Sequence, residues 1–183
     1  MTTFTALLRG INVGRAKRIA MADLRRLFAD LGYADVRTLL NSGNVVFAAK
    51  SPDAAGHARA IQPAIERGFG FTVPVIVVTA ADLSAILLEN PLRDVADDPA
   101  RHLVAFVQDP TALDAAKPLL ARSWSPEAFA LGKRAAYLWC ADGVADSEIV
   151  KAFTRLTGET ATTRNRTTAA KIQATIGGDA RPA

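Results

Sequence analysis

The sequence of 183 residues contains little cysteine or histidine and no long apolar run. Cys140 is the only cysteine, which excludes an internal disulfide. His57 and His102 are the only histidines, and neither has a cysteine or carboxylate at metal-ligand spacing, so we expect no metal site and no cofactor. Apolar stretches such as 75–78 and 86–88 are far shorter than the roughly 18–20 residues of a membrane span.

The N-terminal segment also lacks the pattern of a secretory signal. Residues 1–8 have no basic region, and Arg9 interrupts the apolar run that follows Met1. We therefore expect a cytoplasmic protein without a membrane partner. A hydrophobic fraction of 50% with 22% charged residues is typical of a folded globular protein and argues against disorder. The length allows one large domain or two small ones, and it leaves the oligomeric state open.

The charge is unevenly distributed along the chain. The formal net charge is +4. Residues 1–26 have six basic and one acidic side chain, residues 27–149 have 10 and 15, and residues 150–183 have six and two. The positive charge therefore lies at the two ends of the chain, around an acidic middle. Such ends suggest an anionic partner, which a nucleic acid or a small anion could provide.

Hydrophobic periodicity predicts an alternation of strands and helices in the first half of the chain. The tight Asn41–Asn44 segment favours a hairpin between two strands. Pro63 is expected to kink or split the second helix. The expected elements are a strand at 4–9, a helix at 21–31, strands at 36–40 and 45–48, a helix at 51–67, a strand at 73–78, and a helix from Thr79 to just before Asn90. The first six of these elements follow the order of the split βαβ, or ferredoxin-like, arrangement.

The second half repeats this order of elements, although its residues differ. The expected elements are a strand at 102–107, a short helix from Pro110 interrupted at Pro118, strands at 128–131 and 135–140, a helix at 147–156, a short strand at 160–163, and a last helix at 166–176. We predict an α+β fold of two ferredoxin-like (split βαβ) subdomains, with antiparallel sheets and helices packed on one face. Residues 1–90 form the first subdomain with an added helix, residues 100–183 form the second with a C-terminal helix, and a linker lies between them.

Three loops of the first subdomain are predicted to lie at one end of its sheet. The topology brings together the segments 9–14, 41–44 and 68–70, which collect glycines and asparagines. Glycine lets backbone N–H groups approach a ligand and form an anion-binding nest, and an arginine fork suits carboxylate or phosphate. The candidate ligand-binding residues here are Arg9, Asn12, Gly14, Asn41, Ser42 and Asn44. The alternative is structural, since Ser42-Gly43 also suits a plain hairpin turn.

A second candidate segment is residues 162–168, which combines hydroxyl side chains with Arg164, Asn165 and Arg166. Hydroxyls and asparagine are preferred helix N-caps, so one interpretation is a capping sequence with arginines that face solvent. The other is a second anion site at a helix N-terminus that carries Arg164 and Arg166. Arg164 and Asn165 are the candidate ligand-binding residues of this segment, and they could complete the site of the first subdomain. The sequence does not show whether the two basic ends of the chain meet in space.

Three segments also carry a resemblance to a known family. Residues 7–14 (LLRGINVG), 41–47 (NSGNVVF) and 163–165 (TRN) resemble the hallmark segments of a bacterial family known only as a domain of unknown function. The resemblance implies a two-subdomain α+β fold built on ferredoxin-like units and brings no established activity. Two positions depart from the family pattern. Arg15 stands where the family often has glycine, which we expect to stiffen the loop, and Arg166 stands where it usually has tryptophan.

These patterns leave three hypotheses for function. The first is a small-anion site for a phosphate, nucleotide or carboxylate, with no catalytic residue assigned because no general base is evident. The second, less favoured, is nucleic-acid binding by the basic ends. The third is an interaction module without a ligand. Whether any reaction is catalysed is left open.

Overall fold

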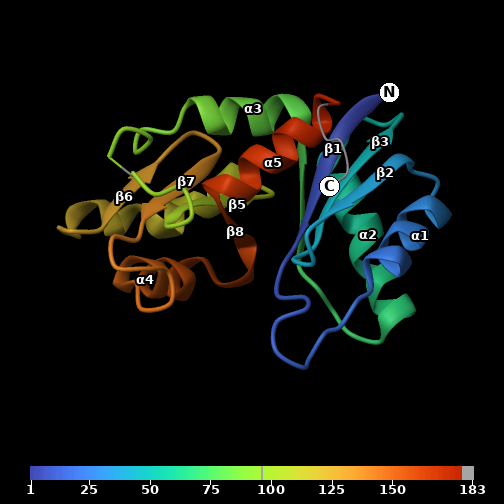
Figure 1. Ribbon diagram of the computed structural model, residues 1–183, viewed down its shortest axis with the longest axis horizontal. Coiled ribbons are helices and arrows are strands. Elements are labelled where there is room, and N and C mark those ends of the chain that lie inside the picture. Colours follow the sequence, from blue (N-terminus) through green and yellow to red (C-terminus); the bar gives the residue numbers. More distant parts are fainter. Residues whose placement is uncertain (96, 179–183) are drawn as a thin grey trace. The chain divides into compact units, whose positions relative to one another are not determined.

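The computed structural model describes residues 1–95 and 97–178 of the chain (Figure 1). Its contacts divide the chain into two compact units, each described here by itself. Unit 1 contains residues 1–81 and the C-terminal segment from Ile172, and unit 2 contains residues 82–171. The residues 90–100 that were expected to form a linker fall within unit 2.

Unit 1 is built on a four-stranded antiparallel sheet in the order β2-β3-β1-β4. Helices α1 and α2 cover one face of this sheet (Figure 1). This is the split βαβ arrangement that the sequence predicts. Its elements are β1 (Thr2–Leu8), α1 (Met21–Asp30), β2 (Ala34–Leu39), β3 (Asn44–Ala49), α2 (Ala54–Phe69) and β4 (Val75–Thr79).

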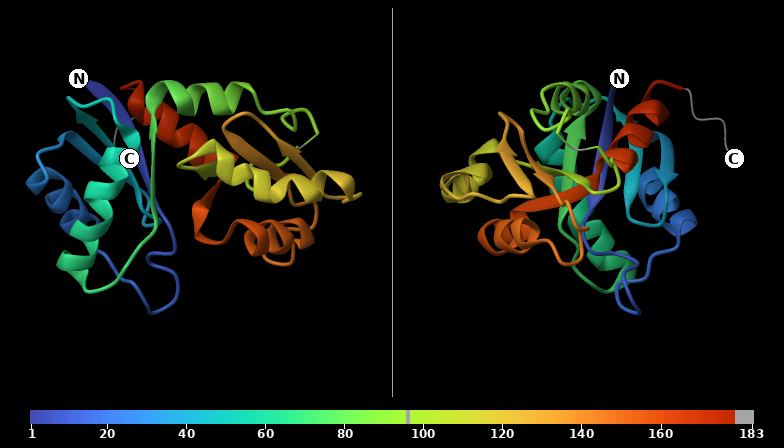
Figure 2. Two further views of the ribbon diagram at one scale, coloured as in Figure 1. Left: turned by 180° about the vertical axis from the view of Figure 1, so that it is seen from behind. Right: turned by 60° about the vertical axis from the view of Figure 1, so that its left-hand side comes forward.

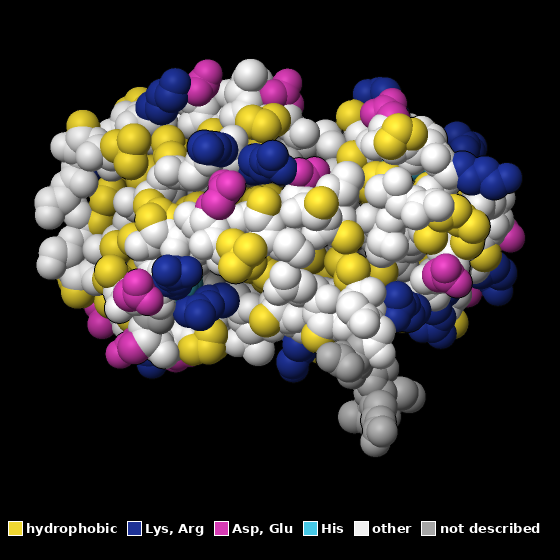
Figure 3. Space-filling view, turned by 90° about the horizontal axis from the view of Figure 1, so that it is seen from above, with side chains coloured by type: hydrophobic (Ala, Val, Ile, Leu, Met, Phe, Trp, Pro, Cys, Tyr) yellow, Lys and Arg dark blue, Asp and Glu magenta, His cyan; other side chains and the backbone are white. Residues whose placement is uncertain are grey.

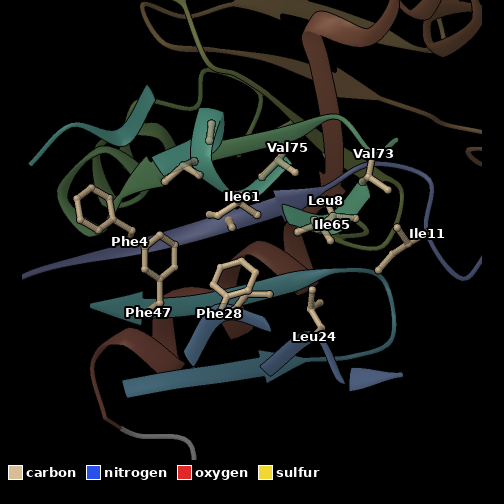
Figure 4. Close-up of a cluster of buried hydrophobic side chains, with 14 of the residues drawn as sticks. Phe4, Leu8, Ile11, Leu24, Phe28, Phe47, Ile61, Ile65, Val73 and Val75 are labelled. Atoms are coloured by element: carbon tan, nitrogen blue, oxygen red, sulfur yellow. The ribbon is translucent and has the colours of Figure 1, made fainter. Parts of the chain in front are cut away.

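The core of unit 1 lies between the sheet and the two helices (Figure 4). Phe4 of β1 and Phe47 of β3 are stacked, with their ring centroids 5.5 Å apart, and Phe28 of α1 meets Phe47 edge-on at 5.4 Å. Phe4 and Phe47 are cross-strand partners, which explains why the two rings lie together. Ile11 and Val73 extend the same cluster to the loops at one end of the sheet (Figure 4).

The sequence predicts that Pro63 kinks or splits helix α2, and the split does not occur, since α2 continues through Pro63. Asp53 caps its first turn by accepting a hydrogen bond from the N–H of Gly56 at 2.8 Å, and Gly70 ends it in the left-handed conformation. Pro63 lies on the exposed side, while Ile61 and Ile65 are buried. Burial of this apolar face offsets the one hydrogen bond that a proline removes.

Unit 2 contains the second antiparallel sheet, in the order β6-β7-β5-β8. The α+β fold with two ferredoxin-like subdomains that the sequence predicts is thus confirmed. The elements are α3 (Ala80–Leu88), which begins at the unit boundary, β5 (His102–Val107), η1 (Pro110–Ala121), β6 (Ala128–Leu131), β7 (Ala135–Trp139), α4 (Glu148–Thr157), η2 (Gly158–Thr160), β8 (Ala161–Asn165) and α5 (Arg166–Ile176), which extends past the boundary into unit 1.

Helices η1 and α4 lie side by side on one face of the second sheet, where Leu113, Ala116 and Phe153 fill the core (Figure 2). The opposite face contacts α3, since the hydroxyl of Tyr137 donates to the carbonyl of Ile86 at 2.7 Å. η1 is a 3₁₀ helix that contains Pro118, so the interruption expected at this proline is wrong.

His102, at the start of β5, is fully buried and has a defined tautomer. The Oδ1 of Asn90 accepts from the N–H of Leu92 at 2.9 Å, which turns the Nδ2 of Asn90 toward the Nε2 of His102 at 3.0 Å. Nε2 is therefore an acceptor and Nδ1 holds the proton, although Nδ1 has no partner among the described residues. Burial first, and the charge of Arg166 second, lower the pKa of His102 to about 4.

This depressed pKa predicts a loss of stability in mild acid. Between pH 6.5 and about 4 the unfolded chain binds a proton at His102 that the folded protein does not bind, so the free energy of unfolding falls as the pH is lowered. The contribution that is lost is about 3 kcal/mol. Urea titrations between pH 7 and pH 4 should show this fall in the native protein and a shallower one in His102→Leu. Equal pH profiles for the two proteins would contradict it.

Candidate functional site

Three segments of unit 1 meet at one end of its sheet. The topology predicts this meeting, but the third segment is residues 70–74 and not 68–70, because Gly68 and Phe69 belong to the last turn of α2. We call residues 9–20, 40–44 and 70–74 together the loop edge. Because β1 runs antiparallel to both β3 and β4, the end of β1 lies beside the beginnings of those two strands. The N–H of Leu8 donates to the carbonyl of Gly43 at 2.8 Å, and the N–H of Arg9 donates to the carbonyl of Pro74 at 2.9 Å.

Asn12 holds the first segment against the hairpin. Its Nδ2 donates to the carbonyl of Asn41 at 2.8 Å and to the carbonyl of Ile19 at 2.9 Å. Its Oδ1 accepts from the N–H of Ile19 at 2.9 Å, and its own N–H donates to the carbonyl of Lys17 at 3.1 Å. The positive φ of 56° at Asn12 suits asparagine better than most residues. The amide of Asn12 therefore shapes the loop and has no donor left for a ligand.

The loop that Asn12 closes is anchored in the core at two further points. Ile11 and Ile19 are both buried, and both belong to the apolar cluster of unit 1 (Figure 4 labels Ile11). Lys17 adds a contact to the third segment, because its Nζ donates to the carbonyl of Thr72 at 3.0 Å. Beyond the loop, α1 begins at Met21 without a side-chain cap. Its first N–H groups therefore lack the usual capping partner.

The hairpin between β2 and β3 is a loop of four residues, Leu40–Gly43, since Leu39 pairs with Asn44. Asn44 is buried, and its Nδ2 donates to the carbonyl of Leu39 and to Oγ of Ser42, both at 3.0 Å. Asn44 therefore supports the turn from inside. Asn41 and Ser42 are exposed, and the carbonyl of Asn41 is the acceptor for Asn12.

The loop edge is basic and contains no acidic residue. Its charged side chains are Arg9, Arg15, Lys17 and Arg18. Arg15 and Arg18 are exposed, and neither forms an ion pair or side-chain hydrogen bond within the described residues. Gly14, between them and the Asn12 clamp, is exposed with a φ of 62° and has open space where a Cβ would stand. Arg15 and Arg18 therefore bring exposed positive charge to a loop whose backbone is accessible at Gly14.

Arg164 and Asn165, the other two residues expected to bind a ligand, belong to unit 2. Arg164 is buried in β8, where its Nη1 donates to the Oγ1 of Thr162 at 3.1 Å and to the carbonyl of Thr163 at 2.8 Å. Burial lowers the pKa of Arg164 to about 10, so it stays charged at neutral pH. Asn165 caps α5, since its Oδ1 accepts from the N–H of Thr168 at 2.8 Å.

Two exposed residues of the loop edge were not among the candidate residues predicted from the sequence. Val13 is 71% exposed and Leu40 is 51% exposed. Leu40 also has a left-handed backbone, with a φ of 54°. The only signal in the sequence was an apolar residue placed among the glycines and asparagines of each loop, which is easily overlooked because single exposed apolar residues are common.

Unit 1 also contains a pair, half-buried Tyr33 and buried His57, that the sequence did not reveal. The hydroxyl of Tyr33 lies 3.0 Å from Nδ1 of His57, and Nε2 of His57 lies 3.0 Å from the carbonyl of Ser51. Because a carbonyl only accepts, Nε2 carries the proton and Nδ1 accepts from Tyr33. Burial raises the pKa of Tyr33. The pair lies within the aromatic cluster around Phe47, and we assign it a structural role.

The rest of the described chain adds neither a metal centre nor a membrane segment. Among residues 1–95 and 97–178, no three His, Cys, Asp or Glu side chains gather where they could hold a metal ion. In the same residues no helix has the length and apolar character needed to cross a membrane.

Comparisons with known proteins identify relatives of the fold. The solved structure of a conserved bacterial protein from Streptococcus pneumoniae is similar, with a TM-score of 0.75 and 22% sequence identity. The similarity covers 97% of this chain and 99% of the other. No curated protein matches the sequence. The model of a family described as protein of unknown function, DUF1697, matches residues 1–137, and the chain therefore belongs to that family.

Proposed function

We propose that unit 1 binds a small anion, a phosphate, nucleotide or carboxylate, at the loop edge. The observation that carries the proposal is the clamp made by Asn12, which fixes the loop, while Arg15 and Arg18 are exposed and have no carboxylate partner among residues 1–95 and 97–178. A pre-formed loop binds with less loss of conformational entropy than a mobile one. The two arginines supply charge and planar donors that match phosphate and carboxylate oxygens.

The candidate residues then divide into two roles. We assign Arg9, Gly14 and Ser42, together with Arg15 and Arg18, to direct contact with the ligand. Asn12, Asn41 and Asn44 position the loops, because their amide or carbonyl groups are engaged in hydrogen bonds within the loop edge. The uncapped start of α1 adds the partial positive charge of a helix N-terminus.

We propose binding and not catalysis at this edge. None of its three segments contains a histidine, cysteine, aspartate or glutamate, the residues that most often act as general acid, general base or nucleophile. A cytoplasmic location is part of the proposal and stays a prediction.

The face of the molecule seen in Figure 3, on the side away from the loop edge, gives no support to a long nucleic acid as the ligand. On the face shown in Figure 3, Lys and Arg side chains lie in small groups beside Asp and Glu side chains. Among the described residues, no continuous basic stripe covers that face. Proteins that follow a nucleic-acid backbone need such a stripe, because each phosphate contact adds only a small part of the affinity.

The experiment that tests the proposal is a thermal-shift titration with inorganic phosphate, pyrophosphate and citrate. A ligand that binds only the folded state raises Tm, and at 100 times its Kd it stabilises the fold by about 2.7 kcal/mol. We expect at least one of these anions to raise the Tm of the native protein, and the rise to shrink in Arg9→Ala. No rise with any of them, or an equal rise in Arg9→Ala, would overturn the proposal.

A further inference from the structure

The loop edge carries exposed apolar side chains as well as exposed arginines. Apart from the N-terminal Met1, Val13 and Leu40 are the only exposed large hydrophobic residues in the described part of unit 1. Val13 follows Asn12 in the chain, and Leu40 precedes Asn41. Asn12 and Asn41 are the two residues that the clamp hydrogen bond joins. The clamp therefore holds the backbone that carries Val13 and Leu40 within the same loop edge that carries Arg15 and Arg18.

Leu40 is an unusual choice for its position. With a φ of 54° it adopts a conformation that glycine and asparagine tolerate and that costs a leucine free energy. Burial does not offset this cost, because about half of the side chain is exposed to solvent. Neither the turn nor the core thus accounts for a leucine here. A strained residue that its surroundings do not explain is a reason to look for a functional contact.

We propose that the ligand of the loop edge is a small amphiphilic anion, whose charged group meets Arg15 and Arg18 and whose apolar group contacts Leu40 and Val13. This inference rests on the anion site proposed above and names the class of its ligand. The anionic end of the ligand is inferred from charge complementarity, since Arg15 and Arg18 are positive and form no ion pair within the described residues. The apolar end follows from Val13 and Leu40, the two exposed hydrophobic side chains of the same loop edge. An alkyl or aryl phosphate has this chemistry.

The test is a titration of the native protein with n-alkyl phosphates from methyl to hexyl, followed by NMR. Affinity is expected to rise about twofold with each methylene, because a methylene covered on one side gains roughly half the free energy of full burial. The variant Leu40→Asn keeps the left-handed turn and removes the apolar side chain. We expect it to bind methyl phosphate as the native protein does and to lose the dependence on chain length.

The same variant has a readout that needs no ligand. Asparagine relieves the backbone cost at position 40, so the Tm of Leu40→Asn should rise by about 2–4 °C. The matched control is Leu120→Asn, which replaces another exposed leucine, 55% exposed, in η1 of unit 2. This control should leave the dependence on chain length unchanged.

Each outcome decides between the proposals. Affinity that rises with chain length in the native protein and in Leu120→Asn, but not in Leu40→Asn, supports the inference. Binding of phosphate without dependence on chain length overturns it and leaves the anion site standing. No binding of any phosphate overturns the anion site as well. Binding only to vesicles of phosphatidylglycerol and phosphatidylcholine, and not to dissolved alkyl phosphates, overturns the small ligand in favour of a membrane surface.

Discussion

The substitution Gly43→Ala is expected to lower the free energy of unfolding by about 2–5 kcal/mol. Gly43 has a φ of 79°, which costs an alanine about 1–2 kcal/mol. An added Cβ would also lie only 2.7 Å from Cβ of Leu8 and 3.0 Å from Cδ1 of Ile11. The isoleucine tip can move, but Cβ of Leu8 can move only with the backbone of β1, so overpacking adds about 1–3 kcal/mol.

Gly10→Ala is the matched control for this prediction. Gly10 has a similar φ of 70°, but nothing lies within 4 Å of the position of its missing Cβ. Gly10→Ala should therefore lower the free energy of unfolding by the cost of the positive φ alone, about 1–2 kcal/mol. Urea denaturation of both variants separates the two contributions. If both variants lose the same free energy of unfolding, the close approach of Gly43 to Leu8 adds no cost of its own. That result would contradict the prediction.

The double substitution Arg15→Glu with Arg18→Glu is expected to weaken pyrophosphate binding about 100-fold. Each reversal replaces an attraction by a repulsion, and about 1.4 kcal/mol per site corresponds to a tenfold loss. The fold itself should keep its stability within about 0.5 kcal/mol, because both side chains are exposed and unpaired among the described residues. Isothermal titration calorimetry measures the affinity, and urea denaturation measures the stability.

The control for net charge is Lys50→Glu with Arg59→Glu. Lys50 follows the last residue of β3, and Ala49 pairs with Thr2, so Lys50 lies at the opposite end of the sheet from the loop edge. Arg59 is exposed in α2. This control has the same net charge as the test variant and should lose less than about threefold in affinity if the ligand lies at the loop edge. An equal loss in both variants would indicate a nonspecific effect of total charge.

The order of the elements could be predicted because it depends on local patterns. Alternation of apolar residues located the strands, helical spacing located the helices, and the rules of antiparallel pairing placed three loops at one sheet end. The last helix begins at Arg166 as predicted, since a hydroxyl-rich segment with Asn165 is a typical start. The two internal prolines were misjudged, because packing of a buried helix face offsets a missing hydrogen bond, and no local pattern reports that packing.

The roles of the asparagines could not be predicted from the sequence. A loop asparagine has the same amide group whether it binds a ligand or the protein backbone. Only the tertiary arrangement decides which of these partners the amide binds. Asn12 and Asn44 face the backbone here, and Asn165 caps a helix. The burial of Arg164 could not be predicted either, because it depends on where its strand ends. The strand that holds it extends to Asn165, two residues beyond the prediction, which turns Arg164 inward beside Val104.

The most direct test of an anion site at the loop edge is an NMR titration of the ¹⁵N-labelled protein with pyrophosphate. The site predicts saturable shifts of the backbone amides of Gly10, Gly14 and Ser42, with little change at Lys50. In Arg15→Glu with Arg18→Glu the same shifts should need about 100-fold more pyrophosphate to reach half of their full size. Shifts confined to other parts of the chain, such as residues 163–168, or no shifts at saturating pyrophosphate, would contradict the site.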